Sequence, residues 1–221
     1  MRIEIEALAC QRGGRTVFRD VDFSVPAGTA ALLRGPNGVG KSTLLRVLAG
    51  LIPASAGRCL LDGLPASPSD LQEHVAYSGH LDAVKPALTV RQNLDVWAGI
   101  FGANSDVDTA LAFFGLDELF DRPVAQCSAG QKRRLGLARL LVTDRPVWLL
   151  DEPTVSLDQA SAQLVADMIN RHCEAGGSAM IATHIDLALP DGPVLDMVPP
   201  APAEPGSGAA DTQDAFLDGQ W

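Results

Sequence analysis

One stretch of the sequence has the residue types and the spacing needed to bind phosphate groups. It matches the pattern G-x-x-x-x-G-K-[ST] and consists of Gly35, Pro36, Asn37, Gly38, Val39, Gly40, Lys41, Ser42 and Thr43. Glycines let the backbone curl so that successive N–H groups face phosphate oxygens, and a following helix adds the positive end of its dipole. Lys41 can place its ammonium against the β- and γ-phosphates of ATP, and the Ser42 hydroxyl can bind Mg²⁺. The alternative is a glycine-rich turn that binds nothing, which the apolar strand before the motif and the helix after it disfavour.

Two adjacent carboxylates, Asp151 and Glu152, follow the apolar run of residues 147–150. Asp151 at the strand end can hold Mg²⁺ through water, and Glu152 on the opposite side can polarise an attacking water as a general base. An apolar strand followed by acids is weak evidence by itself, because a solvated turn has the same pattern. With the phosphate loop upstream we favour the catalytic interpretation, since a P-loop ATPase needs an acid at a neighbouring strand end.

A third candidate is a helix start that precedes the acid pair in the sequence. Ser128 and Gln131 form an S-x-x-Q capping box, with Ala129 and Gly130 between them. The N-terminus of such a helix, approached through small residues, can bind an anion. A plain helix cap is the alternative, because capping boxes are frequent.

Strands that alternate with helices are expected to position these candidates in an α/β core. Residues 2–8 alternate as an edge strand does, and the apolar run 147–150 is typical of the centre of a parallel sheet. We expect a P-loop core with a mostly parallel sheet, an antiparallel β part near the N-terminus and a helical lobe inserted at about residues 85–143. Further strands are expected at residues 17–25, 29–33, 58–61, 74–77 and 178–183, and helices from the phosphate loop to residue 51 and at 106–115, 130–142 and 159–175.

Side-chain positions on these elements lead to three more expectations. The polar side of the helix at 130–142 carries Arg133, Arg134 and Arg139. Helical spacing also relates a set of apolar residues, which form either the core of the lobe or a groove for a partner's helix: Val90, Leu94, Trp97 and Phe101. His74 and His172 are interpreted as surface histidines.

Composition narrows the class of protein further. Hydrophobic residues make up 47% of the 221 residues, which is enough to build a substantial core. The net charge of −10 disfavours a nucleic-acid partner, because proteins that bind nucleic acids usually present a basic surface. We find no apolar run long enough to cross a bilayer and no signal peptide. Scattered cysteines without a C-x-x-C motif indicate reduced, cytosolic thiols: Cys10, Cys59, Cys127 and Cys173.

The run from Cys127 to Gln131 resembles the signature of the ATP-binding cassette family, whose usual form is L-S-G-G-Q. Cys127 replaces the leucine and Ala129 replaces the first glycine. Residues 156–158 resemble the family's D-loop, and His184 resembles its switch histidine, which contacts the γ-phosphate. The resemblance covers about residues 1–198 and implies hydrolysis of ATP with Mg²⁺ as cofactor. It also implies a head-to-tail dimer in which one copy's phosphate loop faces the other copy's signature residues Ser128, Gly130 and Gln131.

Two positions depart from the family pattern. Arg12 stands where an aromatic residue usually stacks on adenine, and a guanidinium can also stack on a base. His80 stands where the Q-loop glutamine is expected, and a neutral imidazole can accept a hydrogen bond or bind a metal as the amide oxygen does. From spacing alone, His80 is equally well a surface histidine.

Three features resemble one branch of the family, the ATP-binding subunits of the haem exporters of cytochrome c maturation. They are Gly79-His80, the Ser-Ala-Gly-Gln signature followed by Lys-Arg-Arg-Leu, and Trp148 in the acid-pair strand. The resemblance implies integral membrane partner subunits, a peripheral place on the cytoplasmic face of the inner membrane, and no haem site in this chain. The main alternative is the ATPase of another importer or exporter, for an amino acid, a lipid or a drug. A soluble cassette protein acting on nucleic acid and an idle structural cassette are weaker alternatives.

The composition changes at Pro199. Residues 199–221 are rich in Pro, Ala and Gly and contain no Lys or Arg, so we expect a disordered acidic tail after the cassette. Docking of the tail's Phe216, Leu217 and Trp221 on a partner is the alternative.

Overall fold

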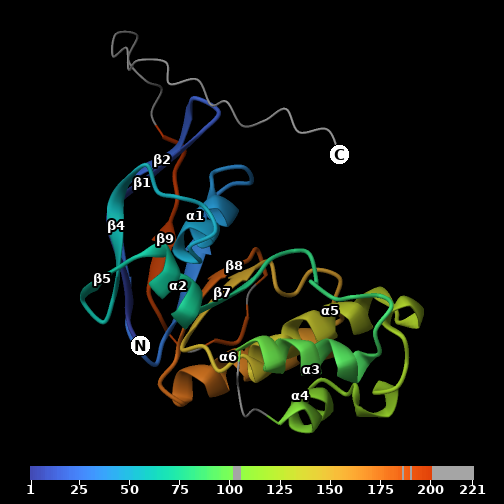
Figure 1. Ribbon diagram of the computed structural model, residues 1–221. Helices are drawn as coiled ribbons and strands as arrows, with labels where there is room; N and C mark the ends of the chain where they lie inside the picture. Colours follow the sequence, from blue (N-terminus) through green and yellow to red (C-terminus); the bar gives the residue numbers. More distant parts are fainter. Residues whose placement is uncertain (102–105, 186, 190, 201–221) are drawn as a thin grey trace.

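Two β-sheets of different kinds form the framework of the computed structural model (Figure 1), which describes residues 1–101, 106–185, 187–189 and 191–200. The first sheet is antiparallel, in the order β2-β1-β4-β5, from β1 (Ile3–Arg12), β2 (Arg15–Val25), β4 (Ala56–Leu61) and β5 (Leu64–Ala66). Strand β1 lies between β2 and β4, so the expectation that residues 2–8 form an edge strand is wrong. The alternation there has another cause: Ile3, Ile5 and Leu8 face the core and the residues between them do not.

The second sheet is parallel and carries the strands on which the acid pair and the phosphate loop depend. Its order is β6-β7-β8-β3-β9, from β3 (Ala30–Arg34), β6 (Val75–Ser78), β7 (Val147–Asp151), β8 (Ser178–Ala182) and β9 (Val194–Asp196). Every residue of β7 and β8 is buried, as expected for central strands covered on both faces. The fold class expected from the sequence is therefore confirmed, although β5 and β9 were not expected.

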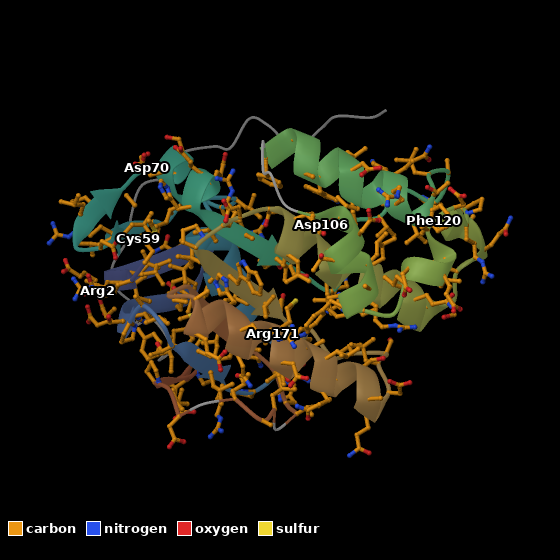
Figure 2. All side chains as sticks on the ribbon, turned by 90° about the horizontal axis from the view of Figure 1, so that it is seen from below. Arg2, Cys59, Asp70, Asp106, Phe120 and Arg171 are labelled. Atoms are coloured by element: carbon orange, nitrogen blue, oxygen red, sulfur yellow. The ribbon has the colours of Figure 1, made fainter. Side chains whose placement is uncertain are left out.

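Helices cover both faces of the parallel sheet. Helix α1 (Lys41–Leu48) lies between the two sheets (Figure 1), and one hydrophobic core joins its leucines to both of them. A second core on the other face joins the sheet to the remaining long helices, α3 (Val90–Phe101), α4 (Val107–Phe113), α5 (Ala129–Ala138) and α6 (Gln159–Glu174). Figure 2 shows the resulting two-part shape, with Arg2 and Cys59 at the strand-rich end and Phe120 at the far end of the helices. The three helices between β6 and β7 form the helical lobe.

Short elements complete the chain. Helix α2 (Pro68–His74) begins with a capping box at Ser67, and His74, expected in a strand, is its last residue. Three 3₁₀ turns follow within the lobe, η1 (Asp117–Leu119), η2 (Val124–Gln126) and η3 (Arg139–Val142). Helix α1 ends at Leu48, not at residue 51, and the helix expected at residues 130–142 is α5 followed by η3. Of the expected tail, Pro199 and Pro200 are described and the remainder lies outside the described residues. The cysteines Cys10, Cys59, Cys127 and Cys173 are free and buried.

The arginines expected on the polar side of the helix at residues 130–142 are held against other segments, and Arg133 is buried. Each one donates hydrogen bonds to backbone carbonyl groups of other segments: Arg133 to three, Arg134 to Phe114 and Arg139 to Tyr77. Burial lowers the pKa of Arg139, and the nearby positive charge of Arg133 lowers it further. Arg133 and Arg139 therefore tie the lobe to the parallel sheet, whereas Arg134 joins α5 to the end of α4 within the lobe.

His172 is half-buried against the sheet, so the expectation of a surface histidine is wrong. Its ring stacks on Trp148 of β7, with ring centroids 3.7 Å apart and planes 7° from parallel, and its Nε2 lies 3.2 Å from the Ser178 carbonyl oxygen. Burial lowers the pKa of His172 below its ordinary value. The stack joins α6 to the central strand, so it belongs to the packing of the second core.

This stack predicts that the protein loses stability as the pH falls. The unfolded chain takes up a proton at His172 near about pH 6.5, whereas the folded protein resists protonation. Stability is therefore fully present above that pH and decreases below it. His172→Phe keeps an aromatic ring on Trp148 and should flatten the decline in Tm between pH 7.5 and 5.5, with His74→Phe as control. Parallel Tm–pH curves for wild type and His172→Phe would contradict this assignment.

Candidate functional site

The phosphate loop, residues 35–43, leads from β3 into α1 and requires glycine at two of its corners. Gly35 and Gly40 have φ values of 137° and 111°, which other residues rarely adopt. A Cβ atom on Gly35 would lie 2.6 Å from the Met197 carbonyl oxygen, and one on Gly40 would lie 2.8 Å from the Val17 side chain. The loop is therefore packed between β2 and the segment after β9, with its last glycine at the N-cap position of α1.

Lys41 points back into this loop. Its ammonium donates to the carbonyl oxygens of Gly35 at 2.7 Å and Pro36 at 3.2 Å, and the residue is only 8% exposed. Among the described residues no carboxylate forms an ion pair with it. Burial of a cation without an opposite charge is costly, so the loop favours an anion beside Lys41. This arrangement suits the phosphates of a nucleotide.

Glu152, His184 and Asn37 converge from three separate segments. His184 follows β8, and its Nε2 lies 2.9 Å from Asn37 Oδ1 in the phosphate loop and 3.3 Å from Glu152 Oε1. Because Asn37 Oδ1 only accepts hydrogen bonds, Nε2 donates to it when it carries the proton, and the Glu152 carboxylate lies beside the same ring nitrogen. Glu152 adopts a left-handed φ of 50°, and its N–H donates to the Ala182 carbonyl at the end of β8. The structure thus brings together the predicted base, the predicted switch histidine and the phosphate loop.

Asp151 is the last residue of β7 and is 5% exposed. The Tyr77 hydroxyl donates to Asp151 Oδ2 at 3.3 Å, and Arg46 of α1 donates to the Tyr77 oxygen at 3.4 Å. Burial raises the pKa of Tyr77, so it remains a neutral donor. One signal in the sequence points to this contact: Tyr77 is the single tyrosine of the chain, and it lies in a strand of the parallel sheet.

One buried carboxylate and one hydroxyl, from Asp151 and from Ser42 in the first turn of α1, suit Mg²⁺. That ion is usually held by one or two protein oxygens together with substrate phosphates and water. Within the described part of the chain, no group of three or more His, Cys, Asp or Glu residues is arranged to hold a metal ion. The donor set is therefore one that a bound nucleotide would complete.

The signature residues form the expected cap but do not reach the phosphate loop of the same chain. Ser128 Oγ accepts from the Gln131 N–H at 3.2 Å, and Gln131 Oε1 accepts from the Ser128 N–H at 2.8 Å. Helix α5 lies among the lobe helices, away from α1 (Figure 1). The start of α5 instead meets the D-loop, where a Cβ atom on Gly130 would lie 3.7 Å from the Ser156 carbonyl oxygen.

Arg12 and His80 lie outside the group formed by the phosphate loop, Glu152 and His184. Arg12 is exposed at the end of β1, opposite Arg15, whereas Thr16 and Val17 line the hollow of about 290 Å³ beside the phosphate loop. His80 is exposed after β6 and lines another cavity, of about 590 Å³, here called the His80 cavity. Side chains of α1, β6, α3 and η3 complete that cavity, among them Arg46, Tyr77, Trp97, Phe101 and Arg139, and Leu81 of the segment after β6 also lines it.

The apolar face of α3 divides between the two interpretations offered for it. Val90 and Leu94 are buried in the second core. Trp97 and Phe101, one and two turns later, stack on each other and line the His80 cavity. The first half of the helix is therefore lobe core, and the second half borders a cavity.

A phosphate loop at the start of a helix between two sheets, with a carboxylate at the end of another strand of the same parallel sheet, defines a P-loop nucleotide-binding domain. Two solved structures share the fold: an ATP-binding subunit of an ABC transporter and an ABC transporter ATP-binding protein from Pyrococcus furiosus. Their TM-scores are 0.76 and 0.77, with 24% and 21% identity. The matches cover 84% and 89% of this chain and 80% and 98% of those chains.

The sequence pattern of the ABC transporter family matches residues 18–155. Among curated proteins, the cytochrome c biogenesis ATP-binding export protein CcmA of Rhodobacter capsulatus is 53% identical, over 89% of this chain and 87% of that protein. CcmA of Roseobacter denitrificans is 48% identical, over 98% of this chain and all of that protein. The chain belongs to the ABC transporter family, and it is an ATP-binding, ATP-hydrolysing subunit of that family. In the described residues, no helix has the length and apolar character needed to span a membrane.

Proposed function

We propose that this chain drives an export complex of cytochrome c biogenesis, handling haem, by binding and hydrolysing ATP. The observation that carries the proposal is the similarity to CcmA proteins across almost the whole chain. The proposed cassette comprises residues 1–198, with the helical lobe at about residues 85–143. No part of this role requires the chain itself to bind haem.

The proposed mechanism assigns a step to residues of the phosphate loop and to the side chains that converge on it. Lys41 exchanges the carbonyl groups of Gly35 and Pro36 for the nucleotide phosphates, which the N–H groups of the loop also bind. Ser42 and Asp151 would hold Mg²⁺, which neutralises phosphate charge when it is bound.

Hydrolysis itself would depend on the acid and the histidine beside it. Glu152 accepts the proton of the attacking water. His184, held between Asn37 and Glu152, donates to a γ-phosphate oxygen. Both side chains reach the loop from strand ends, so the rigid sheet fixes their separation.

Two kinds of partner complete the proposal. A second copy would place its Ser128, Gly130 and Gln131 against the nucleotide, because within one chain α5, at whose start they stand, lies away from α1 (Figure 1). Integral membrane subunits would contact the rim of the His80 cavity, where Leu81 is 72% exposed beside Trp97 and Phe101. The chain would then act peripherally on the cytoplasmic face of the inner membrane.

His80 keeps its proposed role as the counterpart of the Q-loop glutamine. If its imidazole accepts a hydrogen bond at the site, His80→Gln should retain the ATPase activity of the assembled complex and His80→Ala should lower it severalfold. Steady-state phosphate release checks this prediction. Equal activities of wild type and His80→Ala would assign His80 to the membrane-partner surface instead, which crosslinking at position 80 can detect.

Deletion of the gene tests the proposed function. The deletion strain should lack covalent haem on its c-type cytochromes, whereas b-type cytochromes persist because they do not need covalent attachment. Haem-stained gels and difference spectra of membranes report the two classes separately, and a plasmid copy should restore the c-type bands. Normal c-type bands in the deletion strain would refute the role in cytochrome c biogenesis and leave the ATPase assignment intact.

A further inference from the structure

Arg133 is a buried arginine that joins three segments around the acid pair. It lies on α5, is 4% exposed, and uses every nitrogen of its guanidinium. On one edge, Nε donates to the Pro153 carbonyl at 3.1 Å and Nη2 donates to the Glu152 carbonyl at 2.7 Å. On the other edge, Nη1 donates to the Gly79 carbonyl at 2.9 Å and to Asp82 Oδ1 at 3.2 Å.

This contact set depends on the shape of arginine as well as on its charge. The guanidinium is a rigid planar fork with donors on separate edges, so it can hold two segments at a fixed distance. A lysine ammonium has its donors on one atom and cannot reach both edges at once. The charge is offset by the Asp82 carboxylate and by carbonyl dipoles, so the buried cation is satisfied.

The Glu152 backbone is held from both sides. Its N–H donates to the Ala182 carbonyl at the end of β8, and its carbonyl accepts from Arg133. Between these two bonds the residue has a φ of 50°, a left-handed conformation that is strained for a non-glycine residue. Such a conformation persists only where the surroundings fix it, and this one directs the side chain toward His184.

A second contact attaches the segment of residues 79–82 to the same helix. One turn beyond Arg133, a Cβ atom on Gly136 would lie 2.6 Å from the Asp82 carbonyl oxygen and 3.0 Å from the Asp82 Cα. Helix and segment therefore meet backbone to backbone. Because Gly79 and His80 line the His80 cavity, α5, the cavity rim and the Glu152 backbone are linked through adjoining contacts.

We propose that Arg133 is a positioning residue for ATP hydrolysis: it fixes the backbone of Glu152 and ties it to residues 79–82 of the cavity rim. This inference rests on the proposed role of Glu152 as general base. Arg133 does not approach the phosphate loop through any of its hydrogen bonds, so its effect should fall on turnover and not on nucleotide binding.

Arg133→Lys in the purified full chain tests the proposal, with Arg134→Lys as the matched control. Arg134 is the next residue on the same helix, but its Nη1 donates to the Phe114 carbonyl within the lobe. We expect Arg133→Lys to lower kcat by about 10- to 100-fold, as misplacement of a catalytic group does. The Kd for MgATP, measured by calorimetry, should stay within about twofold because the loop is unchanged. Arg134→Lys should change neither quantity.

Three outcomes would overturn the proposal. The first is an unchanged kcat in Arg133→Lys. The second is a joint loss of kcat and nucleotide affinity, which would indicate a general role in the fold. If Arg133→Lys does not fold, Asp82→Ala replaces it as the test, because it removes the partly exposed carboxylate that Arg133 Nη1 contacts. The third outcome is an unchanged kcat in Asp82→Ala. Glu152→Gln in the same assay distinguishes failure of the proposed general base from failure of the proposed role of Arg133. Normal hydrolysis by Glu152→Gln would show that Glu152 is not the base. An inactive Glu152→Gln together with a normal Arg133→Lys would reject only the role of Arg133.

Discussion

Glu152→Gln should lose steady-state ATP hydrolysis by at least about 100-fold while it still binds ATP. A glutamine amide has nearly the shape of the carboxylate but cannot take a proton from water. The residues proposed to bind the nucleotide, Lys41 and Ser42, lie elsewhere, so affinity should persist. His184 Nε2 keeps its hydrogen bond to Asn37 Oδ1, which does not depend on the charge of residue 152. The Glu152→Gln site should therefore keep its geometry and its ATP binding but lose ATP hydrolysis.

The measurement combines phosphate release with size-exclusion chromatography in the presence of MgATP. A nucleotide-bound dimer should accumulate for Glu152→Gln, because hydrolysis no longer separates the two copies. Glu174→Gln, an exposed glutamate at the end of α6, is the matched control and should turn over ATP as wild type does. Full hydrolysis by Glu152→Gln would contradict the assignment of this residue as the base.

Lys41→Ala should weaken ATP binding by about 10- to 100-fold, the loss expected when a charged hydrogen-bond donor of roughly 1.5–3 kcal/mol is removed. Lys41 is buried, and its ammonium forms hydrogen bonds only with loop carbonyls in the described structure, so phosphate gains a charge partner there. Turnover should fall with affinity, because the same charge is used in the transition state.

Calorimetric titration with MgATP gives the affinity directly. Lys85→Ala, which removes an exposed lysine in the segment after β6, is the control and should bind as wild type does. The folded fraction of Lys41→Ala is checked by its thermal transition, which should be close to that of wild type because no carboxylate loses a partner. Unchanged affinity in Lys41→Ala would contradict the assignment of the phosphate loop to the nucleotide site.

Local patterns in the sequence predicted the parts of the site that local chemistry determines. The glycines and Lys41 form a loop because their spacing alone sets the turn into α1. Ser128 and Gln131 cap α5 reciprocally, as a capping box requires. The apolar run of β7 also predicts its structure, because such a run forms a strand covered on both faces, and this strand ends at Asp151.

Contacts between distant segments could not be read from the same patterns. The sequence placed Arg133 on the polar side of an amphipathic helix, but it could not show that the carbonyl groups of residues 79, 152 and 153 accept its hydrogen bonds in the folded chain. Nothing in the sequence indicated that His172 stacks on Trp148, because only the folded sheet brings the two residues together. The apolar alternation of β1 was correct, but its neighbours in the sheet depend on β4, which lies far along the chain.

In the proposed function, ATP hydrolysis by this chain supports the attachment of haem to c-type cytochromes. This role can be tested by measuring covalent haem on c-type cytochromes in a deletion strain that carries wild-type, Glu152→Gln or Glu174→Gln alleles at equal protein levels. We expect normal haem-stained bands with wild type and Glu174→Gln, and bands as weak as those of the deletion strain with Glu152→Gln. Full c-type bands in the strain that carries Glu152→Gln would show that ATP hydrolysis is not needed for this role.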